Sequence, residues 1–280
     1  MKRSLTSVLA LAFALVLATG AFAQLAGTLT WGGSTTVAPF VYAAIEQFQK
    51  DNPGVKISYE ATGSGAGLTS LLAGQYSLAG SSAIVPADQI AKGALPVVVA
   101  YDGMTPVVNK SVKLSNIGQA DLAKIFAGKI SNWKDVGGQD MKIVVVNRDE
   151  SSGTYASFWD IVCLPTQGKA RSYTKDAIVA KENGEVAAKV ASTPGSIGYV
   201  GMAFADEVIK KGGRALMVNG IKDTVPNVLS KKWPISRELF LVTMGAPKDD
   251  SVEKAFIDFL LSAKGQAIVK SADFIPLPKN

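Results

Sequence analysis

The chain has 280 residues, of which 48% are hydrophobic, with no histidine and one cysteine. This length suits one large domain or two of ordinary size, and the apolar content excludes a disordered or collagen-like chain. The composition also excludes a Ser-His-Asp or Cys-His nucleophile, a His-ligated zinc site, a cysteine-cluster metal site and an intrachain disulfide. The formal net charge is +6, but the basic residues are scattered, which favours a solvated surface over nucleic-acid binding.

Residues 1–23 are typical of a secretory signal peptide. A positively charged start precedes an apolar run at residues 8–17, and the small-residue site Ala21-Phe22-Ala23 follows. The run is too short to span a bilayer, and no later segment is long and apolar enough to do so. The alternative is a short anchor that stays uncleaved. We expect cleavage after Ala23 and a periplasmic or secreted protein.

Short apolar strands alternate with helical patterns along the rest of the chain. The expected strands are 29–31, 55–61, 97–100 with 106–109 extending it, 143–146, 196–200, 215–218 and 239–244. The expected helices are 40–48, one that carries Leu68 and Leu71, 117–126, 152–162 and a final one over 252–263. This alternation is typical of α/β layers with parallel sheets. Strands near 100–108 and 239–244 are the candidates for connecting two domains.

Three of the strand-to-helix turns share one composition, with glycine beside serine or threonine. They are Gly32-Gly33-Ser34-Thr35-Thr36, Thr62-Gly63-Ser64-Gly65-Ala66-Gly67 and Arg148-Asp149-Glu150-Ser151-Ser152-Gly153-Thr154. A helix N-terminus has unpaired N–H groups and a positive dipole end, and glycine lets an anion approach closely. Helix capping alone would also explain each turn. Because parallel sheets gather such turns at one edge, three of them predict a shared anion site.

Arg148 strengthens this prediction, since a guanidinium can grip two oxygens of a tetrahedral oxyanion. The alternative for Arg148 is a surface salt bridge with Asp149 or Glu150, and Glu150 could also orient the guanidinium from behind. The glycine-rich turn at 63–67 matches neither of the common nucleotide-binding loops, so a single small anion is the simpler ligand.

Taken together, these segments resemble the phosphate-binding subunit of bacterial phosphate ABC transporters. The resemblance runs from about residue 28 to 278. It rests on the three turns and on Ile125-Phe126-Ala127-Gly128-Lys129-Ile130-Ser131-Asn132-Trp133, Thr193-Pro194-Gly195-Ser196-Ile197-Gly198-Tyr199-Val200 and Phe256-Ile257-Asp258-Phe259-Leu260-Leu261-Ser262. It implies a type II periplasmic-binding fold, with two α/β lobes joined by two crossover strands and a ligand cleft between them. The expected division is lobe I at 24–104 plus 238–280 and lobe II at 105–237.

The resemblance also implies a role for individual residues. Thr35 would donate its hydroxyl, Thr36 its backbone N–H and Ser64 a further hydrogen bond. Arg148 would pair with the anion, and Glu150 would pair with Arg148. The expected phosphate-binding set is Ser34, Thr35, Thr36, Ser64, Gly65, Ser82, Asp102, Arg148, Ser152, Gly153 and Thr154. No cofactor is implied, and the partners would be inorganic phosphate and the permease of an ABC importer, with the receptor itself a monomer.

One departure from the family concerns the segment Gly80-Ser81-Ser82-Ala83-Ile84. Members of the best-known branch of the family carry an aspartate where this chain has Ser82, and that carboxylate accepts a hydrogen bond from protonated phosphate. Sulfate has no such proton, so the loss of the carboxylate bears on selectivity. Asp102, at the expected first crossover, is the candidate substitute. The alternatives are that Asp102 is a turn residue before Gly103, or that Ser82 simply donates to the anion.

Other functions remain open from the sequence. The same fold could bind sulfate, molybdate or tungstate, or it could serve adhesion or sensing at the cell surface. A hydrolase of phosphoesters would need Ser64 or Ser152 with a lysine base, and neither serine lies in an S-x-x-K or G-x-S-x-G turn.

Overall fold

The computed structural model describes residues 25–278, so the expected signal peptide lies outside the described residues. The strands are β1 Gly27–Gly33, β2 Val55–Glu60, β3 Ala79–Ser81, β4 Ala94–Val108, β5 Asn116–Ile117, β6 Val144–Arg148, β7 Ile178–Ala180, β8 Ser196–Gly201, β9 Arg214–Ala215, β10 Met217–Val218 and β11 Ser236–Met244. The α-helices are α1 Ala38–Asp51, α2 Ser64–Leu72, α3 Ala87–Ala91, α4 Gln119–Phe126, α5 Gly153–Phe158, α6 Leu164–Gln167, α7 Asn183–Ser192, α8 Met202–Ile209, α9 Val225–Leu229, α10 Val252–Leu261 and α11 Ala263–Ser271. A 3-10 turn covers Trp133–Val136 and a π-helical segment covers Trp159–Cys163. Across residues 25–278, no helix combines the length and the apolar character needed to cross a membrane.

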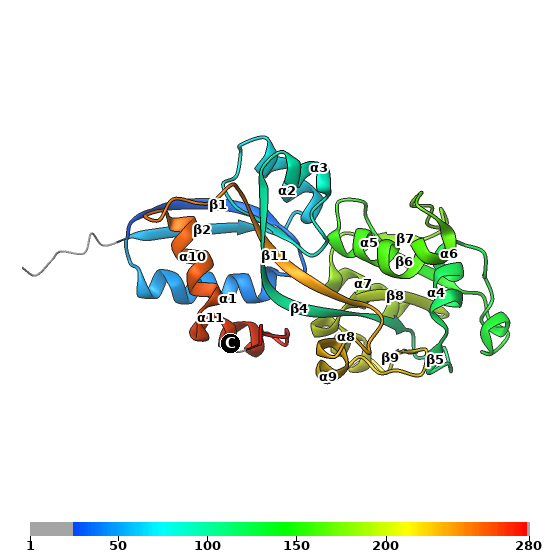
Figure 1. Ribbon diagram of the computed structural model, residues 1–280. Coiled ribbons are helices and arrows are strands. Elements are labelled where there is room, and N and C mark those ends of the chain that lie inside the picture. The colour runs from blue at the N-terminus through cyan, green and yellow to red at the C-terminus, as the bar shows by residue number, and fades with distance from the viewer. Residues whose placement is uncertain (1–24, 279–280) are drawn as a thin grey trace, which may run out of the picture.

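A nine-stranded mixed sheet connects the two ends of the molecule (Figure 1). Its order is β2-β1-β3-β11-β4-β8-β6-β7, and β9 pairs with β4. The flanking pairs are parallel, with β1 beside β2 and β3, and β6 beside β7 and β8. Antiparallel pairs arise only where β4 and β11 join the described sheet. The prediction of parallel α/β layers is therefore confirmed for the strands on either side of β4 and β11.

Strands β4 and β11 run side by side through the middle of the molecule, as Figure 1 shows. β4 is a single strand of 15 residues, as expected from the extension past Asp102 and Gly103. β11 begins at Ser236, three residues earlier than the expected 239–244. The earlier start places Arg237 within the strand, directly opposite Asp102 in the antiparallel register.

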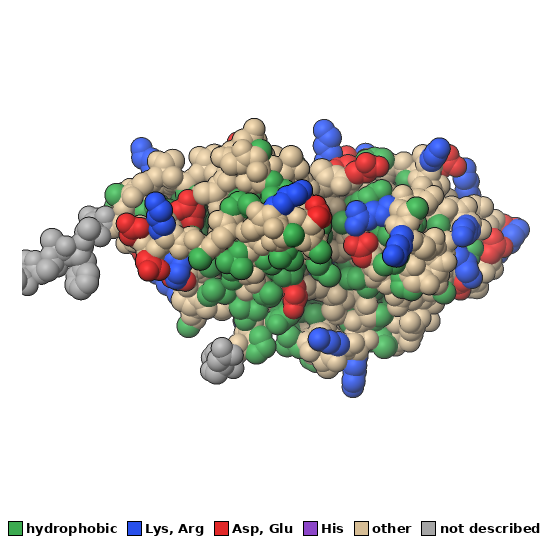
Figure 2. Space-filling view, turned by 45° about the horizontal axis from the view of Figure 1, so that its top comes forward, with side chains coloured by type: hydrophobic (Ala, Val, Ile, Leu, Met, Phe, Trp, Pro, Cys, Tyr) green, Lys and Arg blue, Asp and Glu red, His purple; other side chains and the backbone are tan. Residues whose placement is uncertain are grey.

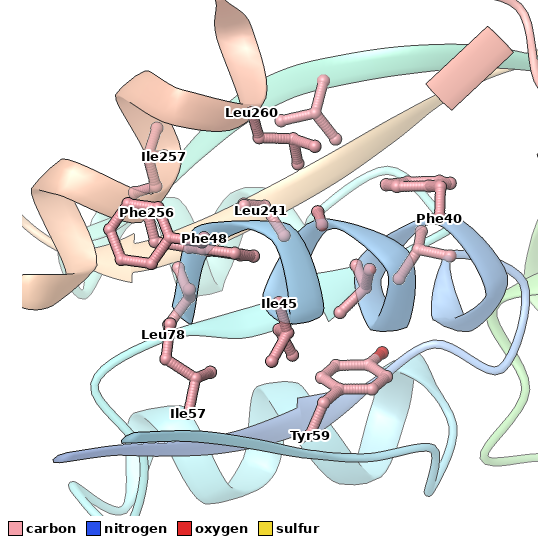
Figure 3. Close-up of a cluster of buried hydrophobic side chains, with 14 of the residues drawn as sticks. Phe40, Ile45, Phe48, Ile57, Tyr59, Leu78, Leu241, Phe256, Ile257 and Leu260 are labelled. Carbon is pink, nitrogen blue, oxygen red and sulfur yellow. The ribbon is translucent and has the colours of Figure 1, made fainter. Parts of the chain in front are cut away.

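The buried hydrophobic residues form a large cluster on each side of these two strands. One cluster combines residues from 29 to 100 with residues from 239 to 274, and α1 packs its apolar face into it (Figure 3). Phe40, Ile45 and Phe48 occupy that face at the helical spacing seen in the sequence. The other cluster draws mainly on residues 104–235. The first cluster thus combines the two ends of the described chain, because β4 carries the chain out of this part of the molecule and β11 brings it back.

Several element boundaries differ from those expected. The helix expected at 117–126 begins at Gln119, because Ile117 instead pairs with β10 as part of β5. The final apolar stretch is two helices, since the Ser262 hydroxyl accepts from the Gly265 N–H and starts a new helix there. Figure 2 shows hydrophobic side chains across the middle of one face, with most of the visible charged side chains over the two ends.

Candidate functional site

The three turns that share glycine and hydroxyl residues meet between the two hydrophobic clusters. The hydroxyls of Thr36 and Thr154 are 3.0 Å apart, although 118 residues separate them in sequence. The Gly65 N–H donates to the Ser151 carbonyl at 2.8 Å, which joins the second turn to the third. Arg148 donates to the Thr35 hydroxyl at 3.0 Å, which joins the third turn to the first. The structure therefore brings together residues of all three turns.

The first turn has an internal arrangement that depends on glycine. Gly33 has a φ of +140°, and a Cβ there would lie 2.9 Å from the backbone nitrogen of Gly80 and closer still to its carbonyl oxygen. The Ser34 N–H donates to that carbonyl at 2.9 Å. The Ser34 hydroxyl in turn accepts from the Thr36 N–H at 3.1 Å. The N–H of Thr36 is thus already bonded, and Thr36 offers its hydroxyl to the cluster instead.

Arg148 ends β6 and is 1% exposed. Its guanidinium donates to the carbonyls of Ala180 at 3.3 Å and Lys181 at 2.6 Å, as well as to Thr35. Burial lowers the pKa of Arg148 to about 10, because the charged form loses its hydration. Nη1 has no acceptor among the described residues. A buried cation with unpaired N–H groups is a strong site for an anion.

The expected pairing of Glu150 with Arg148 is wrong. Glu150 is exposed and forms no ion pair within the described residues. The chain turns away after β6, so the backbone carbonyls at the end of β7 orient the guanidinium in place of a carboxylate. The alternative of a surface salt bridge is also wrong, because Arg148 is buried.

The second and third turns divide into residues that cap helices and residues that face the cluster. The Ser152 hydroxyl accepts from the Tyr155 N–H at 3.2 Å and caps α5. The Ser64 hydroxyl accepts from the Ser82 N–H at 3.0 Å and lies 3.4 Å from the Ser82 hydroxyl. Gly153 faces both serines, since a Cβ there would lie 2.6 Å from the Ser82 Oγ. Helix capping therefore accounts for the Ser152 hydroxyl, whereas Ser64, Ser82 and Gly153 contact one another.

Arg237 is a member of the cluster that the sequence analysis did not identify. Its guanidinium donates to Asp102 at 2.7 and 3.0 Å, to the Ser82 carbonyl at 3.1 Å and to the Thr154 hydroxyl at 3.0 Å. Its Nη2 lies 3.4 Å from the Thr36 hydroxyl. The only sequence signal was its place two residues before the expected start of the second crossover strand at residue 239.

Asp102 is not a turn residue, since it lies within β4 and is 2% exposed. Complete burial raises its pKa, while Arg237 and the N–H groups of Met202 and Gly103 oppose that rise. One carboxylate oxygen accepts from Arg237 and the other from the Met202 N–H at 3.2 Å. Its visible role is to hold Arg237 in place.

Asn183, at the start of α7, was also missed. Its amide nitrogen donates to the Thr36 hydroxyl at 3.1 Å, and its oxygen accepts from the Gly201 N–H at 3.2 Å. No local pattern marks such a residue, because both of its partners come from other parts of the chain.

The chemistry of the cluster is that of anion binding. It holds two guanidinium groups against one carboxylate, together with hydroxyls that can donate to oxygen. Within residues 25–278, neither Ser64 nor Ser152 is hydrogen-bonded to a lysine, so the pairing required by the hydrolase alternative is not formed.

Comparisons with known proteins agree with this chemistry. A model of the PBP superfamily domain matches residues 19–264. The phosphate-binding protein PstS of Borreliella burgdorferi is 41% identical over 247 residues, which are 87% of this chain and 88% of that one. PstS of Bacillus subtilis is 34% identical over 255 residues, 90% of this chain and 81% of that one.

A solved structure is similar over nearly the whole fold. It is a Clostridium perfringens protein assigned as a phosphate ABC transporter substrate-binding protein and solved with bound phosphate. The TM-score is 0.81 at 31% identity, covering 90% of this chain and 100% of that one. The expected type II periplasmic-binding fold is thereby confirmed. With relatives at this identity and coverage, the chain belongs to the PstS family of phosphate-binding proteins, within the PBP superfamily.

Proposed function

We propose that this chain is an exported receptor that captures inorganic phosphate between two lobes and delivers it to the permease of an ABC importer. The observation that carries the proposal is the Nη1 group of Arg148, a buried donor without an acceptor in the described chain. Leaving such a donor unpaired costs about 1–3 kcal/mol, and more for a charged group. An oxyanion beside Thr35, Thr36 and Thr154 would accept from it.

The anion would be held by donors from separate parts of the chain. We assign Arg148, Arg237 and the hydroxyls of Thr35, Thr36 and Thr154 to direct contact. Ser34, Ser64, Gly65, Ser82, Ser152, Gly153 and Asp102 would shape or position this set. Removing an oxyanion from water is expensive, and many fixed donors are needed to offset that cost.

The lobes we propose are 24–104 plus 238–280 and 105–237, joined by β4 and β11. The division of the hydrophobic residues into two large clusters supports these boundaries. An anion that bonds Thr35 on one side and Arg148 on the other favours the closed arrangement over an open one. The closed form would be the one that the permease recognises, and we propose that the receptor acts as a monomer in the periplasm or outside the cell.

The direct test is a parallel calorimetric titration of the mature protein with phosphate and with sulfate. Because Asp102 is paired with Arg237, no carboxylate in the cluster is free to accept a hydrogen bond from protonated phosphate. We expect phosphate to bind more tightly as pH rises through neutrality, since the dianion suits two guanidiniums best. Sulfate should bind within about 100-fold of phosphate, because no like-charge repulsion of several kcal/mol opposes it.

The two ligands also separate the competing interpretations. Binding of neither anion would contradict the proposed function. Strict rejection of sulfate, with phosphate affinity independent of pH, would favour Asp102 as the acceptor of a hydrogen bond from protonated phosphate, which was one of the alternatives left open by the sequence.

Ser82→Asp is expected to increase the preference for phosphate. The Ser82 side chain lies beside Ser64 and Gly153 within the cluster, so a carboxylate there would face the bound anion. It would accept a hydrogen bond from protonated phosphate but repel sulfate, which we expect to bind roughly 100-fold more weakly than in the wild type. Titration of both anions measures the ratio, and Ser82→Asn is the uncharged control. An unchanged ratio would show that Ser82 does not face the ligand.

A further inference from the structure

A hollow of about 490 Å³ lies beside the crossover strands β4 and β11. Its wall includes Ile84, which follows β3, Tyr101 of β4 and Ile161 of the π-helical segment. The wall also includes Leu229 at the end of α9, Trp233, and Arg237 of β11. The volume is within the usual range of pockets for small organic molecules. Both proposed lobes contribute to the wall.

The lining is largely apolar and part of it remains in contact with water. Ile84 is 78% exposed and Leu229 is 47% exposed, although both are large hydrophobic residues. Covering such side chains is favourable, so the hollow gains from an apolar occupant. The charged residues that line the hollow are Lys231 and Arg237 against Asp160 and Glu238, and this balance of charge favours an uncharged occupant.

Trp233 supplies a specific polar feature. The side chain is 1% exposed and lines the hollow, yet its indole Nε1–H has no acceptor within residues 25–278. The buried indole of Trp31, which does not line the hollow, also has no acceptor within these residues, whereas the indole of Trp133 donates to the Gly195 carbonyl at 2.9 Å and that of Trp159 to the Gly168 carbonyl at 3.2 Å. Buried donors normally have a partner, and an acceptor on a bound molecule would provide one.

Two residues connect this hollow to the anion cluster. Arg237 lines the hollow and donates to Thr154 and to the Ser82 carbonyl. Ser157 also lines it and donates to that same carbonyl at 2.9 Å. An occupant would therefore contact a guanidinium that belongs to the anion cluster.

We infer that this hollow is a second binding site, for an uncharged, mainly apolar molecule with a hydrogen-bond acceptor that faces Trp233. An occupant that contacts Ile84 on one side and Leu229 on the other favours the arrangement of lobes seen here. By linkage, it raises the affinity for the anion, and the anion raises the affinity for it. This coupling rests on the proposed phosphate function, whereas the binding site itself does not.

The test uses prodan, an uncharged naphthyl ketone whose fluorescence reports the polarity around it. The mature protein, dialysed free of phosphate, is titrated with prodan, and we expect saturable binding with a blue shift. Leu229→Ser should weaken binding roughly tenfold, since it removes apolar contact area. Val225→Ser is the matched control, because Val225 is equally exposed on α9 and does not line the hollow. Trp233→Phe should weaken binding about fivefold, because it removes the indole donor together with part of the ring that lines the hollow.

Absence of saturable prodan binding, or equal affinities in Leu229→Ser and Val225→Ser, would overturn the site. Phosphate is then titrated with and without saturating prodan, and we expect a severalfold higher affinity in its presence. An unchanged phosphate affinity would overturn the coupling. If phosphate does not bind at all, the proposed function fails while the prodan result still decides the second site.

Discussion

Arg148→Ala is expected to weaken phosphate binding by roughly a thousandfold, about 4 kcal/mol. Arg148 is buried, its orientation is fixed by two backbone carbonyls, and its Nη1 group has no other acceptor in the described chain. Its loss removes both the charge and the paired donors that offset dehydration of the anion. Calorimetric titration with phosphate measures the effect.

Two further variants make this result interpretable. Arg148→Lys keeps the charge but loses the planar fork, so its affinity should lie between those of the wild type and the alanine variant. Arg171→Ala removes an exposed arginine that is paired with Asp160 and should leave phosphate binding unchanged. Thermal unfolding shows whether each variant is folded. A folded Arg148→Ala variant with wild-type affinity would remove Arg148 from the site.

Gly153→Ala is expected to weaken phosphate binding by at least about 100-fold while the protein remains folded. An added Cβ would lie 2.6 Å from the Ser82 Oγ and 2.8 Å from the Ser64 Cβ, with the Ser64 Oγ nearer still. These contacts lie between the third turn and the first proposed lobe, so separation of the lobes relieves them. Alanine is otherwise favoured over glycine within a helix by about 1 kcal/mol.

The matched control for this variant is Gly184→Ala in α7. There the nearest atoms to an added Cβ are the carboxylate oxygens of Glu207, at 3.8 and 4.0 Å. Thermal unfolding and phosphate titration are measured for both variants. If Gly153→Ala bound phosphate normally, close contact between Gly153 and the two serines would not be needed for binding. If it unfolded, the contact would be structural.

The three strand-to-helix turns that the structure brings together could be predicted because their signals are local. Glycine beside serine or threonine at a strand-to-helix turn specifies both the backbone conformation and the hydrogen-bond donors, within a few residues. The same holds for α1, where the spacing of Phe40, Ile45 and Phe48 identifies the buried face without any knowledge of its partner. Even so, the sequence did not show that Ser152 would cap α5 while Thr154 would face the cluster.

Arg237 and Asn183 could not be predicted in the same way. An arginine in an isolated stretch of sequence is most simply a surface residue, and Arg237 becomes a buried ligand candidate only beside Asp102, 135 residues away. The predicted pairing of Glu150 with Arg148 was wrong because closeness in sequence does not ensure contact. Arg148 instead donates to the backbone carbonyls of Ala180 and Lys181, which lie about 30 residues further along the chain.

The amino-acid sequence by itself determined the family, the alternation of strands and helices, and the chemistry of the three turns. Each of these depends on residues that are neighbours along the chain. The tertiary structure alone decided which groups face one another. The pairing of β4 with β11 placed Arg237 against Asp102, and that pairing left the cluster without a free carboxylate. A buried charge takes its role from whichever partner the register of distant strands provides.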